Sequence, residues 1–257
     1  MHDVVPTFDT EAELYSLLHR GSAGDVDYYL GRCRGAHSAL ELGVGYGRIA
    51  LELAACGVQT TGLDNHPGLL GLAEQSARER GLARYFTAAL GNMQGFEFGQ
   101  RFERILIPYT TLYCLLSDRE VEACLRCCRT HLTPGGSLSF DVYESDSFHI
   151  ECDPKDLPET ELEPIVEVSY EGEPLTVYER SSWDKPNQRL DVHYEYHDAT
   201  GSVVHHATIP QRYLLRADME AKLLAAGFQA IEIWGGFRNE ALSADSDRIV
   251  IEARAPS

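Results

Sequence analysis

Short apolar runs separated by amphipathic stretches fill the first 143 residues of the chain. Each run is typical of a buried strand, and several of the amphipathic stretches end at a glycine such as Gly57 or Gly81. The runs predict five strands, at residues 39–42, 58–63, 85–90, 102–109 and 137–143. The stretches predict helices at residues 10–30, with a break at 21–24, and at residues 49–55, 69–80 and 117–131. Strands that alternate with helices are typical of βαβ units in a parallel sheet with helices on both faces.

The pattern changes after Tyr143. Four strands joined by short polar turns are predicted at residues 165–170, 175–183, 190–197 and 203–214, which indicates an antiparallel meander. A helix at 217–226 and strands at 228–234 and 248–253 then return to the earlier pattern. We therefore expect an α/β fold, with a doubly wound sheet of seven strands and an antiparallel β insertion after the fifth. Residues 1–257 are expected to form one domain, made of a helical cap (1–38), a core (39–143), the insertion (144–214) and a C-terminal helix and β hairpin (215–257).

Composition and charge exclude several classes of function. Apolar residues make up 44% of the 257 positions, enough to bury a core, so global disorder is excluded. The net charge of -18 would repel a phosphate backbone or an anionic membrane, so we expect neither nucleic acid nor membrane as a partner. No run of about 18 apolar residues is present, and no signal peptide is expected. The odd count of 7 cysteines predicts reduced thiols and a cytoplasmic location.

The most informative segment follows the first strand and reads Glu41-Leu42-Gly43-Val44-Gly45-Tyr46-Gly47-Arg48. Glycines between a strand and a helix let the backbone approach a ligand closely, although dinucleotide sites and plain tight turns use glycine too. Arg48 stands where a dinucleotide fingerprint has its third glycine, and it would crowd a pyrophosphate. Glu41 suits a ligand with an ammonium or amide group. Asp64 closes the second strand, where a carboxylate can accept both hydroxyls of a ribose.

With these residues the chain resembles the class I S-adenosylmethionine methyltransferases. The similarity covers nearly the whole chain and rests on five further signals in the right order. They are the segment at 25–30 before the glycine loop, Gly62-Leu63-Asp64, Gly91-Asn92-Met93, Leu132-Thr133-Pro134-Gly135-Gly136 and Ala226-Gly227-Phe228. The resemblance implies a Rossmann-like sheet, S-adenosylmethionine as cofactor and S-adenosylhomocysteine as product. Its overall plan is similar to N-methyltransferases that act on amino sugars or glycine.

The resemblance also implies a role for each matching residue. Gly43 and Gly45 would line the methionine part of the cofactor, and Glu41 would orient its amino end. Asp64 would hold the ribose hydroxyls, with Asn65 beside it. Asn92 and Met93 would frame the adenine, although Asn92 replaces the family's common aspartate. Pro108 and Tyr109 end the fourth strand, where the family places the methyl group and the acceptor, and Tyr15 would fold over the site.

Several of these residues also have a purely structural interpretation. Gly47 can serve helix packing alone, and Asp64 can be the N-cap of the helix before Pro67. Cys124, Cys127 and Cys128 share one helix face, which is more typical of a core stripe than of a zinc site, and we expect no metal. His193 and His197 share a strand face but lie about 13 Å apart, too far to bind one ion.

The function expected is therefore transfer of a methyl group to nitrogen or oxygen of a small-molecule acceptor by in-line displacement. An amine acceptor needs little beyond deprotonation to solvent, whereas a hydroxyl usually needs a base or a metal. If a base is used, His149 is the first candidate, with Tyr109 second. Candidates for binding the acceptor are Tyr113, Tyr178, Arg180 and Arg212. The insertion would be a substrate lid or a homodimer sheet.

Three alternatives remain at this point. An NAD(P)-dependent oxidoreductase would share the sheet, but Arg48 argues against it. An aminopropyltransferase would have an acidic loop after the fourth strand, where this chain has none in residues 108–113. A non-catalytic scaffold that binds S-adenosylmethionine would have the same cofactor site.

Overall fold

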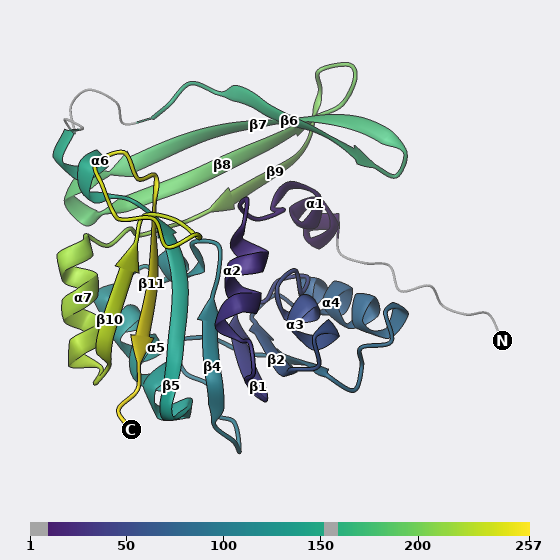
Figure 1. Ribbon diagram of the computed structural model, residues 1–257. Helices are drawn as coiled ribbons and strands as arrows, with labels where there is room; N and C mark the ends of the chain where they lie inside the picture. The colour runs from purple at the N-terminus through teal and green to yellow at the C-terminus, as the bar shows by residue number, and fades with distance from the viewer. Residues whose placement is uncertain (1–9, 152–158) are drawn as a thin grey trace.

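The structure, a computed structural model, describes residues 10–151 and 159–257, and it contains two sheets (Figure 1). The larger has seven strands in the order β10-β11-β5-β4-β1-β2-β3, and the smaller has four in the order β6-β7-β8-β9. The strands of the larger sheet are β1 (Ser38–Leu42), β2 (Gln59–Asp64), β3 (Phe86–Leu90), β4 (Phe102–Ile107), β5 (Leu132–Tyr143), β10 (Gln229–Trp234) and β11 (Arg248–Arg254). Those of the smaller are β6 (Glu163–Tyr170), β7 (Glu173–Asp184), β8 (Arg189–His197) and β9 (Val203–Ile209). The predicted Rossmann-like seven-stranded sheet with an antiparallel insertion is confirmed.

Helices cover both faces of the larger sheet. One face carries α2 (Asp25–Arg32), α3 (Ala50–Ala55) and α4 (Pro67–Glu79), and the other carries α5 (Asp118–His131) and α7 (Arg216–Ala225). Helices α1 (Thr10–Leu18) and α6 (Asp146–Glu151) lie beside the smaller sheet (Figure 1), and 3-10 turns occur at Thr111–Cys114 and Lys185–Asn187. Alternate residues of β4 point to opposite faces, so Ile105 and Ile107 pack in the cluster with α5 and α7, and Leu106 packs with α2 and α3. A central parallel strand is buried on both faces for this reason. Within the described ranges, no helix is long and apolar enough to cross a membrane.

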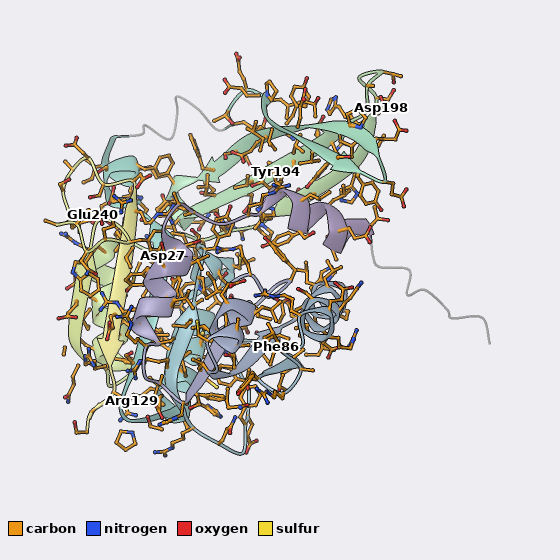
Figure 2. The ribbon with its side chains drawn as sticks, turned by 45° about the vertical axis from the view of Figure 1, so that its right-hand side comes forward. Asp27, Phe86, Arg129, Tyr194, Asp198 and Glu240 are labelled. Carbon is orange, nitrogen blue, oxygen red and sulfur yellow. The ribbon has the colours of Figure 1, made fainter. Side chains whose placement is uncertain are left out.

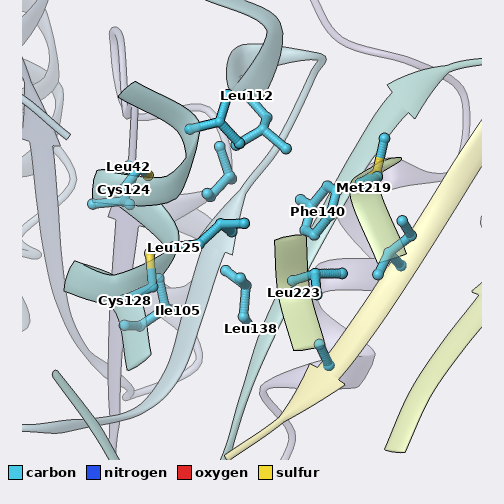
Figure 3. Packing of buried hydrophobic residues seen from close by; sticks show 14 of the residues in the cluster. Leu42, Ile105, Leu112, Cys124, Leu125, Cys128, Leu138, Phe140, Met219 and Leu223 are labelled. Carbon is cyan, nitrogen blue, oxygen red and sulfur yellow. The ribbon is translucent and has the colours of Figure 1, made fainter. Parts of the chain in front are cut away.

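The cysteines of α5 belong to this core. Cys124 and Cys128 are fully buried and lie beside Leu42, Ile105 and Leu125 (Figure 3). Their spacing places them on the face that α5 turns toward the sheet, and Ser117 caps the helix by accepting a hydrogen bond from the backbone N–H of Glu120. In residues 10–151 and 159–257, no group of three or more His, Cys, Asp or Glu side chains is placed to hold a metal ion.

Several predicted boundaries differ from the structure, among them the end of the fourth strand, which lies at Ile107 and not at residue 109. The strand predicted at 203–214 is wrong beyond Ile209, because Pro210 cannot donate to a ladder and the backbone N–H of Arg212 donates instead to the carbonyl of Tyr113. The fifth strand begins at Leu132, directly after α5, with the predicted turn at 134–136 inside it. Its pairing with β4 shifts register between Phe102 and Arg104, which absorbs the extra residues of that turn.

The smaller sheet packs against the N-terminal helix. Leu14 of α1, which is 2% exposed, lies in a cluster with Val177 and Tyr196 of the sheet. Figure 1 shows α1 between this sheet and α4. The carboxyl ends of β1, β2 and β4 meet at the edge of the larger sheet that lies below α1, because these strands run parallel. The insertion and α1 therefore cover the edge at which parallel sheets place their ligands.

Replacement of Leu14 by alanine is expected to lower the free energy of unfolding by about 2–5 kcal/mol, because it leaves a cavity between α1 and the sheet. Leu224→Ala is the matched control, since Leu224 is 61% exposed on α7. Its change should stay within about 0.5 kcal/mol. Chemical denaturation measures both, and equal losses in the two variants would contradict the packing described here.

Candidate active site at the strand ends

The glycine loop after β1 is fixed by its contacts with β2. The backbone N–H groups of Gly43 and Val44 both donate to the carbonyl of Leu63, at 2.8 and 3.0 Å. Gly43, Gly45 and Gly47 all have positive φ, of 67°, 54° and 88°, which disfavours any other residue. A Cβ at Gly47 would lie 2.9 Å from Leu51 Cγ, so this glycine allows close packing. A Cβ at Gly45 would meet nothing within 4 Å, because Gly45 faces a cavity.

Two adjoining cavities lie at this edge, and both are lined by Tyr15, Gly43 and Thr111. The larger has a volume of about 360 Å³ and the smaller about 40 Å³. All nine residues predicted to bind the cofactor line one or both. Asp64, Asn65, Asn92 and Met93 line the larger cavity, Glu41, Gly45 and Pro108 line the smaller, and Tyr15 and Gly43 line both. The ends of four strands, β1 to β4, and α1 thus bring together residues that are far apart in sequence.

Asp64 does not cap α4. The side chain of His66 does so, by accepting a hydrogen bond from the backbone N–H of Leu69. The two carboxylate oxygens of Asp64 accept from the backbone N–H groups of Gly45 and His66, at 2.7 and 2.9 Å. These bonds hold the carboxylate against the glycine loop. Each oxygen keeps a further lone pair with which it can accept a hydrogen bond from a ligand hydroxyl.

Glu41 is a buried carboxyl with spare hydrogen-bonding capacity. It is 3% exposed, and within the described part of the chain its Oε2 has no hydrogen-bond partner. Burial raises its pKa to about 8, an effect that the nearby Arg48 only partly offsets. A buried polar atom without a partner is costly, and a ligand that donates to it removes the cost. An ammonium group in the smaller cavity would do so and would return Glu41 to its charged form.

Arg48 is held away from Glu41 by α2. Its guanidinium binds both carboxylate oxygens of Asp25, at 2.9 and 2.8 Å, in a bidentate pair. Asp25 also accepts a hydrogen bond from the backbone N–H of Ser22, so the same carboxylate holds the turn before α2. The sequence had marked Arg48 only as an obstacle to a pyrophosphate. In the structure it ties the N-terminal segment to the glycine loop.

Tyr109 and Thr110 follow β4, which ends at Ile107, and adopt strained left-handed conformations with φ of 59° and 61°. The buried carboxylate of Asp141 on β5 holds them there. Its Oδ1 accepts two hydrogen bonds, from the backbone N–H of Tyr109 at 2.8 Å and from the hydroxyl of Tyr29 at 2.6 Å. Its Oδ2 forms an ion pair with Arg248 at 2.8 Å. Burial raises the pKa of Asp141, and these donors oppose that rise. The anchored turn directs Tyr109 into the smaller cavity.

His19 is a site residue that the sequence analysis missed. It is 8% exposed and lines the smaller cavity, and its ring lies 4.1 Å from that of Tyr15 between centroids. The rings of Tyr194 and Tyr109 lie 5.3 and 6.2 Å from it. The spacing of four residues between Tyr15 and His19, on one face of a helical segment, was the signal that could have found it.

The other five predicted residues lie outside the two cavities. His149 on α6 is hydrogen-bonded to Tyr213, at 2.9 Å. The hydroxyl of Tyr113, a fully buried residue, donates to the carbonyl of Leu214. Tyr178 and Arg180 lie on the face of the insertion sheet that points away from α1. There the Tyr178 ring contacts the ring of His197, and Arg180 forms an ion pair with Glu159. Arg212 binds Asp118 and Gln188. The structure does not bring these five residues together at the two cavities, and their roles in catalysis and acceptor binding stay predictions.

Replacement of Asp141 by alanine is expected to cost about 3–5 kcal/mol of unfolding free energy, because the buried hydroxyl of Tyr29, the backbone N–H of Tyr109 and the partly exposed Arg248 would all lose their partner. Asp141→Asn keeps an acceptor and should lose less. Asp245→Ala, at an exposed aspartate, is the control and should change stability by less than about 0.5 kcal/mol. Denaturant titration provides the comparison. A loss below about 1 kcal/mol for Asp141→Ala would mean that this carboxylate does not anchor the turn.

The raised pKa of Glu41 predicts a dependence of stability on pH. Its pKa is about 8 in the folded chain against an ordinary value of 4.5, so between these values only the folded chain holds the proton. The free energy of unfolding therefore falls as pH rises through this window. Glu41→Gln should remove that fall. Between about pH 5 and pH 9, the free energy of unfolding of the variant should therefore rise relative to that of the wild type by a few kcal/mol. Glu97→Gln, at an exposed glutamate, should follow the wild type. Parallel curves for Glu41→Gln and wild type would contradict the assignment.

Comparison with known proteins adds the family. Residues 39–136 match the model of a family described as a methyltransferase domain. A Geobacillus sp. (strain WCH70) protein with a provisional methyltransferase designation is 26% identical over 241 residues, which cover 86% of this chain and 85% of that protein. The CcbJ methyltransferase from Streptomyces caelestis superposes with a TM-score of 0.81 at 24% identity, over 96% of each chain. CalS10, an amino pentose methyltransferase from Micromonospora echinaspora whose structure holds S-adenosylmethionine, superposes with a TM-score of 0.66 at 20% identity, over 96% of this chain and 98% of that one. Residues 39–136 of this chain therefore match a methyltransferase domain, and the chain shares the Rossmann-like fold of these proteins.

Proposed function

We propose that the chain transfers a methyl group from S-adenosylmethionine to a nitrogen of a small-molecule acceptor. The observation that carries the proposal is the unpartnered Oε2 of Glu41 in a cavity that adjoins the one lined by Asp64. An amino acid joined to a nucleoside has an ammonium group at one end and ribose hydroxyls near its middle. Glu41 and Asp64 match these two groups, and the family match supports methyl transfer.

The residues of the two cavities fit this cofactor along its length. Glu41 would bind the amino group, and Gly45 leaves open space for the methionine chain. Asp64 would accept the ribose hydroxyls while its present bonds to Gly45 and His66 keep it in place. Asn92 and Met93, at the far side of the larger cavity, would contact the adenine. Tyr15 would close over the junction of the two cavities, which it lines on both sides.

The chemistry requires mainly alignment. S-adenosylmethionine supplies a methyl group that is already activated for displacement. The residues of the chain would then exclude water and hold an acceptor atom in line with that methyl, at about 3 Å. Pro108 and the strained Tyr109 line the cavity where the acceptor would meet the methyl, and the insertion contributes Thr208, Ile209 and Pro210 to the adjoining wall. We assign the insertion the role of lid on these grounds.

A nitrogen acceptor is favoured over oxygen by the groups that face the smaller cavity. A neutral amine is already a nucleophile, whereas a hydroxyl would need a base to remove its proton. Burial lowers the pKa of His19 to about 4, which makes its ring a weak base. Burial raises the pKa of Tyr109, so its hydroxyl stays protonated. CalS10, one of the proteins that share the fold, is an amino pentose methyltransferase, which is consistent with an amine.

Calorimetric titration of the full chain with S-adenosylmethionine, S-adenosylhomocysteine and NAD(H) tests the cofactor. We expect micromolar binding of the two adenosyl ligands and a loss of at least about tenfold in Asp64→Ala, because hydrogen bonds to a charged group are removed. Asp245→Ala is the control and should bind as the wild type does. Binding of NAD(H) alone would overturn the proposal in favour of an oxidoreductase.

Turnover of S-adenosylmethionine carrying a tritiated methyl group then tests the reaction, with a panel of amino sugars and of matched sugars that have a hydroxyl in place of the amine. Label should appear in the amines. Label in the hydroxyl compounds alone would contradict the nitrogen assignment. Tight cofactor binding without any transfer would favour a non-catalytic binding protein.

A further inference from the structure

Two side chains of the glycine loop fasten the segment that joins α1 to α2. The hydroxyl of Tyr46 donates to the backbone carbonyl of His19 at 2.9 Å. The guanidinium of Arg48 binds both carboxylate oxygens of Asp25, the first residue of α2, which is 2% exposed. Arg48 also packs closely on Gly21, since a Cβ there would lie 2.2 Å from the Arg48 Cζ. We call Tyr46, Arg48 and Asp25 the latch.

The fastened segment, residues 19–24, has the properties of a hinge, and we call it the connector. Gly21 and Gly24 have φ of 88° and 87°, a region that glycine enters and leaves without steric cost. Hinges are short segments of this kind, in which a few residues absorb the change in backbone angles. Tyr15 lies on α1 before the connector and His19 lies at its first position, and both line the smaller cavity. Rotation at the glycines would therefore move these two rings relative to the larger sheet.

The smaller cavity needs such a movement before it can admit the cofactor. Its volume of about 40 Å³ has room for about three water molecules, and the amino-acid end of S-adenosylmethionine is larger than that. The walls at Gly43 and Tyr109 are held by the larger sheet, because their backbone N–H groups are hydrogen-bonded to β2 and β5. Tyr15 and His19 are the walls that can move with the connector.

We propose that the latch positions Tyr15 and His19 over the cavities, and that its strength sets how fast an adenosyl ligand enters and leaves. The inference rests on the proposed function. Opening would break the hydrogen bond of Tyr46 and the partly buried ion pair of Arg48 together, so the closed form is favoured. Entry and exit would then depend on the same opening step, as in enzymes that are gated by a moving segment.

A latch and a contact with the ligand have different kinetic effects. A weaker latch raises the open fraction of the free chain and of the bound chain by the same factor, so the association and dissociation rates rise together and the Kd stays constant. A lost contact with the ligand raises the dissociation rate alone. Asp25 lines neither cavity, so its substitution tests the latch without removing a group that would touch the ligand.

Surface plasmon resonance with the full chain immobilised and S-adenosylhomocysteine in solution measures both rates. Asp25→Asn removes the ion pair with Arg48 and should raise both rates about tenfold, with the Kd within about twofold of wild type. Asp27→Asn is the matched control, because it removes the same charge from an exposed position two residues further along α2 (Figure 2). It should leave both rates unchanged.

Tyr46→Phe gives a second measure of the latch and decides the outcome if Asp25→Asn does not fold. It keeps the ring and removes one neutral hydrogen bond to the connector, so both rates should rise about threefold. Unchanged rates, or a rise in the dissociation rate alone, in the deciding variant would overturn the latch and leave the proposed function standing. Absence of binding of S-adenosylmethionine and S-adenosylhomocysteine to the wild-type chain would overturn both.

Discussion

The buried carboxylate of Asp141 is the interaction on which the geometry of the site depends. It joins three elements that are distant in sequence, since its donors come from α2, the end of β4 and β11. A buried charge is stable only when it is fully paired, so none of the three can shift without cost to the others. The consequence at the site is that two consecutive residues, Tyr109 and Thr110, remain in left-handed conformations that they would not adopt alone. Asp141 thus fixes the backbone of Tyr109, and with it the position of the Tyr109 ring in the smaller cavity.

A second ion pair, between Asp25 and Arg48, lies beside a carboxyl that stays unpaired. Asp25 binds both terminal nitrogens of the Arg48 guanidinium, so this cation, which lines the same cavity as Glu41, is already paired. With Asp25 in place, Glu41 stays unpaired at Oε2 and its pKa stays raised, so the site is preorganised for a ligand that brings its own positive charge.

The fold and the cofactor end of the site could be predicted from sequence because they depend on local patterns. Strand ends of a parallel sheet meet at one edge, so Glu41, Asp64 and Asn92 could be placed together from their positions after β1, β2 and β3. The acceptor end could not be predicted in this way. A shift of one residue along a strand moves a side chain to the other face, which is why Tyr178 and Arg180 were chosen although Glu179 and Tyr194 lie on the side of α1. His19 could have been found from its spacing of four residues from Tyr15, but its contact with Tyr194 depends on the packing of α1 under the insertion.

The insertion covers the site with the inner face of a continuous antiparallel sheet, and this has a consequence for specificity. The face packs on α1 through Val177 and Tyr196, and in the same sheet it presents Tyr194 to His19. A change in the insertion would therefore alter the acceptor end while leaving the glycine loop and Asp64 untouched, since these are held by the larger sheet. The two sheets also meet at the larger cavity, where Thr208, Ile209 and Pro210 of the insertion line the same space as Asp64 and Asn92. Helix α1 contacts α4 beside the larger sheet and β6 of the insertion, so it links the two parts of the fold at the edge where the cavities lie.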